Sequence, residues 1–94
     1  MEKEARIFDP AAYLDDDAAI AAYLNDALET GDPAFITDAI GVIARAHGMS
    51  QVAKDSGLSR ESLYRALSST GNPEFATVLK VMSGLGLKLT AEIA

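Results

Sequence analysis

The sequence contains no cysteine and no tryptophan, and a single histidine, in 94 residues. The lack of cysteine excludes disulfides, thiolate nucleophiles and cysteine-ligated zinc. The one histidine, His47, has no neighbouring ligands in the sequence that would complete a metal site. We expect His47 near the end of a helix, where its positive charge suits the helix dipole. No apolar run approaches the roughly 18 residues that a membrane span requires.

The features of an enzyme are also missing. Serine and aspartate are plentiful, but one histidine and no cysteine leave no convincing pair of nucleophile and base. Gly84 and Gly86 precede a predicted strand, so they do not form a phosphate-binding loop. No basic start followed by an apolar run marks a signal peptide. The sequence therefore predicts a protein without catalytic residues, metal, cofactor or membrane contact, and the cytoplasm as its compartment.

Basic residues are few: eight, against 14 acidic residues, which gives a formal net charge of −6. That charge alone argues against nucleic acid as a partner. The charges are unevenly distributed, however. Residues 1–34 hold nine acids and two bases, a net of −7, whereas residues 35–94 hold five acids and six bases, a net of +1. The two parts of the chain therefore suit partners of opposite charge.

Capping residues and apolar spacing predict two long helices in the first half of a single domain, 1–94. Residues 1–9 read as a loose arm. The first helix starts near Asp16 or Asp17 and stops at Gly31, and the second starts at Asp32-Pro33 and ends at Gly48. Gly41 inside the second helix costs about 1 kcal/mol relative to alanine, which a close approach between helices would explain. The residues expected on the buried faces are Ile20, Tyr23, Leu24, Ala27 and Leu28, then Ile36, Ala39, Ile40, Ile43 and Ala44.

Three shorter helices are predicted in the second half. Ser50 caps a helix that runs to about Ser56, and Ser59 caps one that runs to about Leu67 or Ser68. The last helix has Asn72 as its cap, Pro73 at its first position, and an end at Gly84 and Gly86. Its apolar stripe is predicted to be Phe75, Val78, Leu79 and Met82.

Residues 87–93 alternate between apolar and polar side chains, which predicts a strand with one buried face. A lone strand leaves its backbone unpaired, and the chain offers no second strand. The expected partner is therefore the same strand of a second copy, or a strand of another protein. The predicted fold is an all-α five-helix bundle with a short C-terminal β-strand.

Residues 49–68 read as a helix, a tight turn and a second helix. Ala53 supplies the small side chain that two crossing helices need, and Gly57 supplies a residue that tolerates positive φ. Val52, Leu58, Leu63 and Leu67 are expected to face inward. The remaining polar residues form the candidate DNA-binding surface: Gln51, Lys54, Ser59, Arg60, Glu61, Ser62, Tyr64, Arg65 and Ser68.

The second helix of this motif suits the major groove of DNA. Arginine contacts guanine through two hydrogen bonds, and Glu61 can accept one from cytosine. Gln51, near the start of the first helix, is placed for a phosphate. Arg45, just before the motif, adds a further base. The alternative is a helical hairpin that only packs, within a protein–protein adaptor.

The 49–68 stretch resembles the helix–turn–helix of the Cro and lambda-repressor (XRE) superfamily. Roughly residues 8–89 resemble the HigA-like probable addiction-module antidote proteins, which are antitoxins of type II toxin–antitoxin pairs. The matching pieces are Phe8-Asp9-Pro10-Ala11 with Tyr13-Leu14, Thr30-Gly31-Asp32-Pro33, Ala39-Ile40-Gly41-Val42-Ile43-Ala44-Arg45-Ala46, Ser59-Arg60-Glu61-Ser62-Leu63-Tyr64-Arg65-Ala66-Leu67, Gly71-Asn72-Pro73-Glu74-Phe75 and Gly84-Leu85-Gly86-Leu87.

This resemblance implies a Cro/lambda-repressor-like bundle that forms a homodimer. It also implies binding to double-stranded operator DNA, repression of its own operon, and neutralisation of a small basic toxin of the RelE/HigB type, a ribonuclease that cleaves mRNA. The acidic first third of the chain fits a basic toxin, because complementary charge speeds encounter and selects the partner. Two alternatives to an antitoxin remain: the protein–protein adaptor and a stand-alone helix–turn–helix repressor with no toxin.

Overall fold

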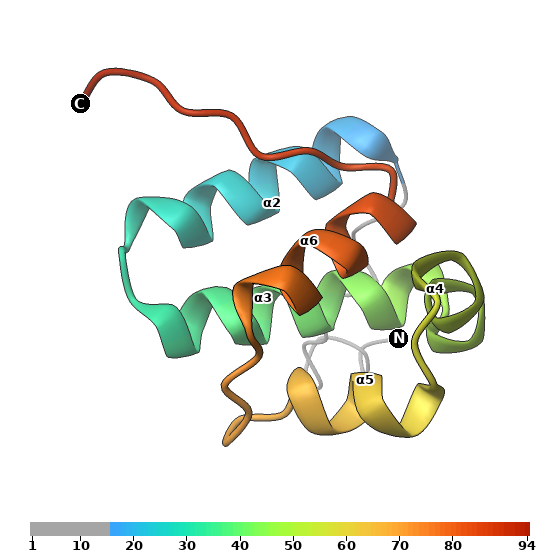
Figure 1. Ribbon diagram of the computed structural model, residues 1–94. Helices are drawn as coiled ribbons and strands as arrows, with labels where there is room; N and C mark the ends of the chain where they lie inside the picture. The colour runs from blue at the N-terminus through green and yellow to red at the C-terminus, as the bar shows by residue number, and fades with distance from the viewer. Residues whose placement is uncertain (1–15) are drawn as a thin grey trace, which may run out of the picture.

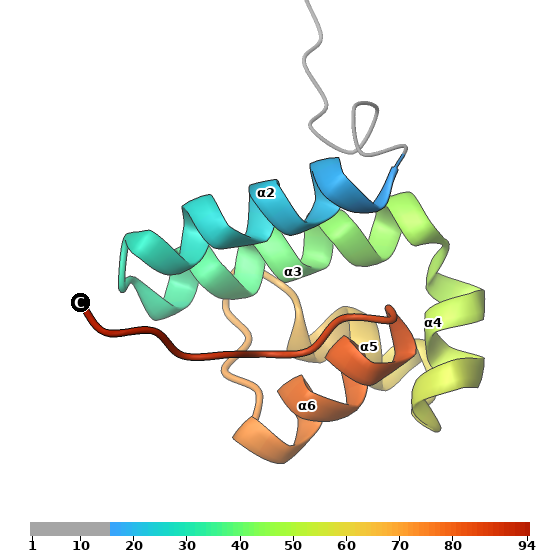
Figure 2. The same ribbon diagram turned by 90° about the horizontal axis from the view of Figure 1, so that it is seen from above.

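A computed structural model describes residues 16–94, and these residues form five α-helices. The expected arm at residues 1–9 lies outside this range. The helices are α2 (Asp17–Glu29), α3 (Pro33–His47), α4 (Met49–Ser56), α5 (Arg60–Ala66) and α6 (Phe75–Gly84). α2 and α3 run antiparallel to each other, α3 lies between α2 and α5, and α4 covers one end (Figures 1 and 2). The all-helical prediction is confirmed for the described part of the chain.

The first two helices start where their capping residues predict. The Asp16 side chain accepts a hydrogen bond from the Ala19 N–H at 2.7 Å. The Asp32 carboxylate accepts from the N–H groups of Ala34 and Phe35 at 3.0 and 3.4 Å, and Pro33 is the first helical residue. Each carboxylate satisfies backbone donors that have no partner within the helix, and it also lies at the positive end of the helix dipole.

The predicted cap of α4 is wrong by two positions. α4 begins at Met49, directly after Gly48, and no side chain caps it. Gly48 turns the chain in one residue with a φ of 110°, so that Ser50 already lies within the first turn of α4. The side chain of Met49 is buried, and this packing holds the start of the helix in place of a cap.

The predicted start of α6 is also wrong. α6 begins at Phe75, with Glu74 at the cap position and no side-chain hydrogen bond, rather than at Pro73 after an Asn72 cap. The loop before it passes close to the end of α5, because a Cβ atom at Gly71 would lie 2.7 Å from the Arg65 carbonyl oxygen. Tertiary contacts of the loop therefore delay the helix beyond the position that the local sequence favours.

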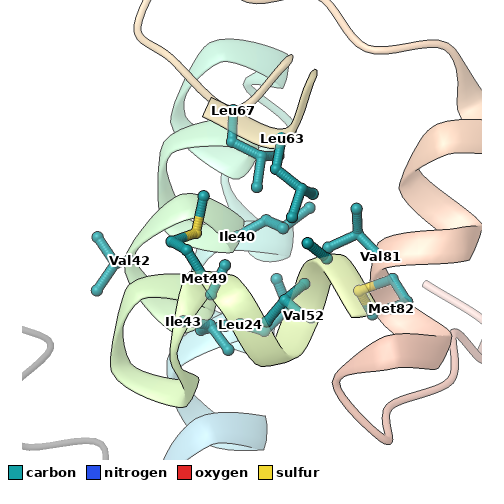
Figure 3. Close-up of a cluster of buried hydrophobic side chains, with 12 residues drawn as sticks. Leu24, Ile40, Val42, Ile43, Met49, Val52, Leu63, Leu67, Val81 and Met82 are labelled. Carbon is teal, nitrogen blue, oxygen red and sulfur yellow. The ribbon is translucent and has the colours of Figure 1, made fainter. Parts of the chain in front are cut away.

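One apolar cluster joins all five helices. The largest fully buried side chains are Ile43, Val52, Leu63, Val81 and Met82, each at 2% or below. No polar or charged side chain is buried among residues 16–94. The cluster fixes the orientation of every described helix, because each contributes at least one side chain to it or its margin. Figure 3 labels its larger members, which are Leu24, Ile40, Val42, Ile43, Met49, Val52, Leu63, Leu67, Val81 and Met82.

At Gly41, α3 comes close to the end of α5. A Cβ atom at Gly41 would lie 3.1 Å from the Leu67 carbonyl oxygen and 3.6 Å from the Leu67 Cβ. The shorter of these distances is tighter than ordinary van der Waals contact, so a side chain here would push α5 away from α3. The expected close approach is confirmed, and it holds α5 against the centre of the fold.

The buried faces of α2 and α3 match expectation, apart from Leu28, which is 39% exposed. The predicted stripe of α6 is half wrong. Met82 is buried and Val78 packs against the core, but Phe75 is 67% and Leu79 45% exposed, and Val81 is fully buried instead. The stripe contains more apolar residues than the neighbouring elements cover, since α6 packs chiefly on α4.

Residues 87–94 leave α6 as a tail that crosses the fold between α2 and α6 (Figure 2). No residue between 16 and 94 is in a strand. The predicted strand at 87–93 requires a partner outside this chain, so its pairing stays a prediction. No helix in the described range is long and apolar enough to cross a membrane.

Candidate nucleic-acid interface

α4 and α5 are joined by the tight turn that the sequence predicts. Gly57 adopts the left-handed conformation, with a φ of 78°. The N–H groups of Gly57 and Leu58 both donate to the Ala53 carbonyl, at 3.0 and 3.2 Å. Ala53 is itself buried. Ser59 then caps α5, because its hydroxyl oxygen accepts from the Ser62 N–H at 3.0 Å. The chain therefore reverses within three residues and starts α5 at a defined angle.

Leu63 decides which side of α5 faces outward. It is fully buried, and Leu67 next to the end of the helix is buried as well. At 100° per residue, these positions turn Glu61 and Arg65 to the side opposite the core and Tyr64 to its flank, while Arg60 is exposed in the first turn of the helix. The structure places the predicted site residues at the surface: Gln51, Lys54, Ser59, Arg60, Glu61, Tyr64 and Arg65 are exposed, and Ser62 and Ser68 are half-buried. Their contact with DNA stays a prediction.

Arg60 and Tyr64 form a pair on the outer face of α5. The Arg60 Nη2 donates to the Tyr64 hydroxyl oxygen at 3.2 Å, and the Arg60 Cζ lies 5.5 Å from the centre of the Tyr64 ring. A cation–π contact at an exposed site is worth about 0.5–1 kcal/mol. The pair restrains the long arginine side chain, while most of its five N–H donors stay available to an acceptor outside the protein.

Three of the other predicted residues, all serines, already form hydrogen bonds with each other or with the backbone. The hydroxyl of Ser59 donates to the Ser62 hydroxyl at 2.9 Å, and the Ser68 hydroxyl donates to the Arg65 carbonyl at 3.0 Å. These serines therefore stabilise the two ends of α5. They can still accept hydrogen bonds, since a hydroxyl oxygen has two lone pairs.

Gln51 does not lie ready for a phosphate. Its Nε2 donates to both carboxylate oxygens of Asp55, at 3.0 Å each, one turn further along α4. The carboxylate adds negative charge beside the amide, and a phosphate would be repelled there. A phosphate contact by Gln51 requires this pair to separate first.

The structure also shows which residues outside α4 and α5 lie beside the candidate interface. Arg45 of α3 lines a small cavity of about 180 Å³ together with Tyr64 and Ser68. The sequence shows Arg45 as a base before the motif, but its place beside α5 depends on the contact at Gly41. A second cavity, of about 470 Å³, lies beside α5 and has many polar groups. Its polar lining comes from Ser62, Arg65, Ser68, Thr70, Asn72 and Thr77.

Acidic side chains are exposed on the other side of α3. The five carboxylates between residues 16 and 34 are all exposed: Asp16, Asp17, Asp26, Glu29 and Asp32. They lie on α2 or next to its ends, and α3 separates α2 from α5 (Figure 1). The described part of the acidic excess therefore lies away from the arginines of α5.

The described residues offer no candidate metal site. Between residues 16 and 94, no three His, Asp or Glu side chains gather closely enough to hold an ion. His47 lies exposed in the last turn of α3, which is the position that the sequence predicts. At that position its charged form stabilises the negative end of the helix dipole.

Residues 16–94 thus form an all-helical fold in which two helices, joined by a tight turn, present arginines outward. Residues 4–93 match the family described as "Probable addiction module antidote protein", and the chain belongs to this family. An uncharacterized protein of Haemophilus influenzae is 48% identical over 92 residues, which span 98% of this chain and 95% of that protein. No solved structure matches the chain. Membership confirms the antidote family, which implies a toxin as partner.

Proposed function

We propose that this antidote binds its own operator DNA as a homodimer through α5, represses its operon, and neutralises a small basic toxin of the RelE/HigB type. The observation that supports this proposal most strongly is the exposure of polar side chains on the outer face of α5. Arg60, Tyr64 and Arg65 are exposed there, while Leu63 fixes the helix from behind. The resemblance of the sequence to Cro-like and HigA-like proteins supports the DNA-binding role.

DNA recognition would proceed through the major groove. α5 lies in the groove with its first turn toward the bases, so that Arg60 and Glu61 meet base edges. Arginine bonds the two acceptors of guanine, and a glutamate accepts from cytosine. Arg45, Lys54 and the polar groups beside α5 contact the phosphates. Two copies read half-sites about 34–36 Å apart, one turn of DNA.

Removing single guanidinium groups tests the DNA interface. We expect Arg60→Ala or Arg65→Ala to weaken specific binding by about 5- to 150-fold where the side chain contacts a base. A phosphate contact would instead lower the salt dependence of binding by about one charge. The measurement is a titration of the upstream operator at several salt concentrations. Both arginines are exposed, so their loss leaves the core unchanged.

A matched control is Lys80→Ala, which removes one positive charge from α6, outside the candidate interface. It should leave specific affinity within about twofold of wild type. Tyr64→Phe tests the pair on α5 separately, because it removes the hydroxyl that accepts from Arg60 and keeps the ring. Equal affinities for wild type, Arg60→Ala and Arg65→Ala would refute the assignment of α5.

The toxin is proposed to meet the acidic surface of α2. Asp26 and Glu29 are three residues apart on α2 and exposed, so they project from one side of it. Because α2 and α5 lie on opposite sides of α3, one molecule could bind toxin and DNA together (Figure 1). Long-range charge attraction mainly raises the association rate.

Charge reversal tests this surface. Glu29→Lys should slow association with the purified toxin and reduce its salt dependence, and DNA binding should persist. Glu74→Lys carries the same change beside α6 and is the matched control. Equal association rates for the two variants would contradict a toxin contact at α2.

Two other functions give different results. A stand-alone repressor would keep the DNA binding that depends on Arg60 and Arg65, but its gene would have no neighbouring reading frame for a small basic protein. A protein–protein adaptor would show no salt-dependent DNA binding, and its partner would still bind the Arg60→Ala and Arg65→Ala variants.

A further inference from the structure

An apolar groove of about 310 Å³ lies where α2 ends and where α3 and α6 begin. Leu28, Pro33 and Ile36 line one side, and Phe75 lines the other. Phe75 is 67% exposed, and Leu79 one turn further along α6 is 45% exposed. Apolar area of this kind, gathered at one end of a small protein, is typical of a contact surface.

The C-terminal tail lies along this groove and continues beyond it. Leu87 packs against the core, and its N–H donates to the Met82 carbonyl at 2.9 Å. That bond is the last backbone hydrogen bond along the described chain. Leu89 lines the groove, whereas Ile93 is 97% exposed. The end of the tail stands away from the helices in Figure 1.

The tail therefore has two unmet requirements. Its backbone groups after Leu87 have no backbone partner in residues 16–94, and the apolar side of its alternating pattern ends in an uncovered isoleucine. Water can form hydrogen bonds with the backbone groups, but the exposure of the isoleucine to water is unfavourable. A second strand would satisfy both at once, by pairing with the backbone and by covering the apolar side.

We propose that this strand is the tail of a second copy, paired antiparallel so that Thr90 faces Thr90 of the partner subunit. In this register Lys88 faces Glu92 of the partner subunit, and the symmetry repeats the pair. Leu87 then faces Ile93 of the partner subunit, and Leu89 faces Ala91 of the partner subunit. This inference rests on the homodimer of the proposed function and specifies where its subunits meet.

The sequence selects this register over its neighbours. In an antiparallel pair, residues directly opposite each other lie on the same face of the ribbon. A shift of the register by one residue would set apolar residues opposite polar ones. A shift by two residues in either direction would no longer place Lys88 opposite Glu92 of the partner subunit. The register centred on Thr90 is the one that pairs all seven residues of 87–93 and both sets of opposite charges. This self-complementarity favours a second copy over an unrelated strand.

The groove and α6 complete the contact. A stable interface buries about 800 Å² on each partner, which is more than two seven-residue strands supply. The odd-numbered residues form the apolar side of the ribbon, and they face the groove that Leu89 already lines. Packing of the ribbon and the second subunit there would also cover Phe75 and Leu79. The same surface meets itself across the two-fold axis, as a symmetric dimer requires.

Charge exchange tests the register directly. Lys88→Glu sets two glutamates opposite each other at both ends of the ribbon, and Glu92→Lys does the same with two lysines. Each variant should raise the dimer dissociation constant about 10-fold or more. The doubly exchanged Lys88→Glu/Glu92→Lys chain should recover the wild-type constant. Sedimentation equilibrium at low salt measures all of these.

A mixture of the two single variants adds a positive result to these losses. An equimolar mixture of Lys88→Glu and Glu92→Lys chains should form a heterodimer. In this heterodimer, no glutamate faces a glutamate and no lysine faces a lysine. In the register centred on Thr90, position 88 of one chain meets position 92 of the other. The Lys88→Glu chain therefore offers two acids, the Glu92→Lys chain offers two bases, and every pair across the heterodimer is opposite in charge. Asp38→Lys, at an exposed position of α3, is the control for a change in net charge.

A second variant tests the apolar side without disturbing the fold. Ile93→Asp changes a side chain that touches almost nothing in the described chain, so the secondary structure should not change while the dimer weakens about 10-fold or more. Phe35→Asp is the control, since Phe35 is 50% exposed but lies outside the groove and the tail. Deletion after Gly86 should also favour the monomer. The point variants are more decisive, because the deletion removes Leu87 and Leu89 from the fold.

The results separate this inference from the proposed function. If the single charge variants dimerise like wild type and their mixture shows no preference, the tail pairing is overturned. Operator binding that still depends on Arg60 and Arg65 would then leave the DNA-binding role standing, with the dimer contact elsewhere. A wild-type chain that stays monomeric at all concentrations overturns the tail pairing and the homodimer together. A monomer whose tail variants lose affinity for the toxin would assign the strand to the toxin and overturn pairing with a second copy.

Discussion

Replacement of Leu63 by alanine should destabilise the protein more than any change at the outer face of α5. Leu63 is fully buried and is the one buried residue within α5. α5 has seven residues, which is too short to be stable on its own. The packing of Leu63 against α3, α4 and α6 therefore holds the helix in place, together with the neighbouring Leu67 (Figure 3).

The size of the effect follows from the burial. A leucine with no exposed surface loses about 2–5 kcal/mol when it is cut to alanine, through lost transfer free energy and the cavity that remains. A chain of this length has a total free energy of unfolding of about 5–14 kcal/mol. One kilocalorie per mole lowers the melting temperature by about 4–8 °C in a domain of this size. We therefore expect Leu63→Ala to melt at least about 8 °C below wild type.

Circular dichroism at the helical minimum, followed during heating and during urea titration, measures this loss. Tyr64→Ala is the matched control, since the next residue along α5 is 49% exposed. It loses the contacts to Arg60 and should cost under about 1 kcal/mol. A Leu63→Ala protein that melts within about 4 °C of wild type would refute the orientation of α5. The outward assignment of Arg60 and Arg65 would then fail with it.

Two further predictions concern α2 and α3. Asp32→Ala should lower the free energy of unfolding by about 0.5–2 kcal/mol in urea, because two N–H groups at the start of α3 lose their acceptor, and Asp32→Asn should recover most of the loss. Burial, and secondarily the negative charge of Asp38, raise the pKa of Tyr23 above its ordinary value near 10, although Arg45 opposes them. The fold therefore favours the neutral phenol. The stability that this contributes is fully present below pH 10 and is lost as the pH rises through the raised pKa. Alkaline titration by ultraviolet absorbance should show a late-titrating component that disappears in Tyr23→Phe, and a Tyr23 that ionises at its ordinary pKa would contradict the packing of α2 on α3.

Local signals in the sequence predicted the two caps with carboxylates and the turn at Gly57, because each depends on neighbouring residues alone. The inward direction of Leu63 followed from helical spacing. The starts of α4 and α6 could not be predicted in the same way. A buried Met49 replaces a cap in α4, and the loop at Gly71 passes close to the end of α5. Both effects depend on how the chain packs in three dimensions.

In the candidate site, too, local features could be predicted and features that depend on three-dimensional packing could not. The composition of α5 indicated which residues are polar, and its period indicated that they are exposed. The position of Arg45 beside Tyr64 depends on how closely α3 and α5 cross, which Gly41 indicates but does not specify. The pair of Gln51 and Asp55 is local, at one-turn spacing, and could have been predicted from the sequence. The exposure of Phe75 and Leu79 was not predictable, because it depends on which elements cover α6.

The separation of the two sides of α5 has a consequence for how this protein can diverge. Leu63 and Leu67 carry the packing, whereas Arg60, Glu61, Tyr64 and Arg65 carry almost none of it. Substitutions at exposed positions usually change stability by less than about 0.5 kcal/mol. Descendants of one gene could therefore exchange all four outer side chains in any order, with no step passing through an unfolded intermediate. Gene duplicates within one genome could acquire separate targets in this way while the same scaffold persists.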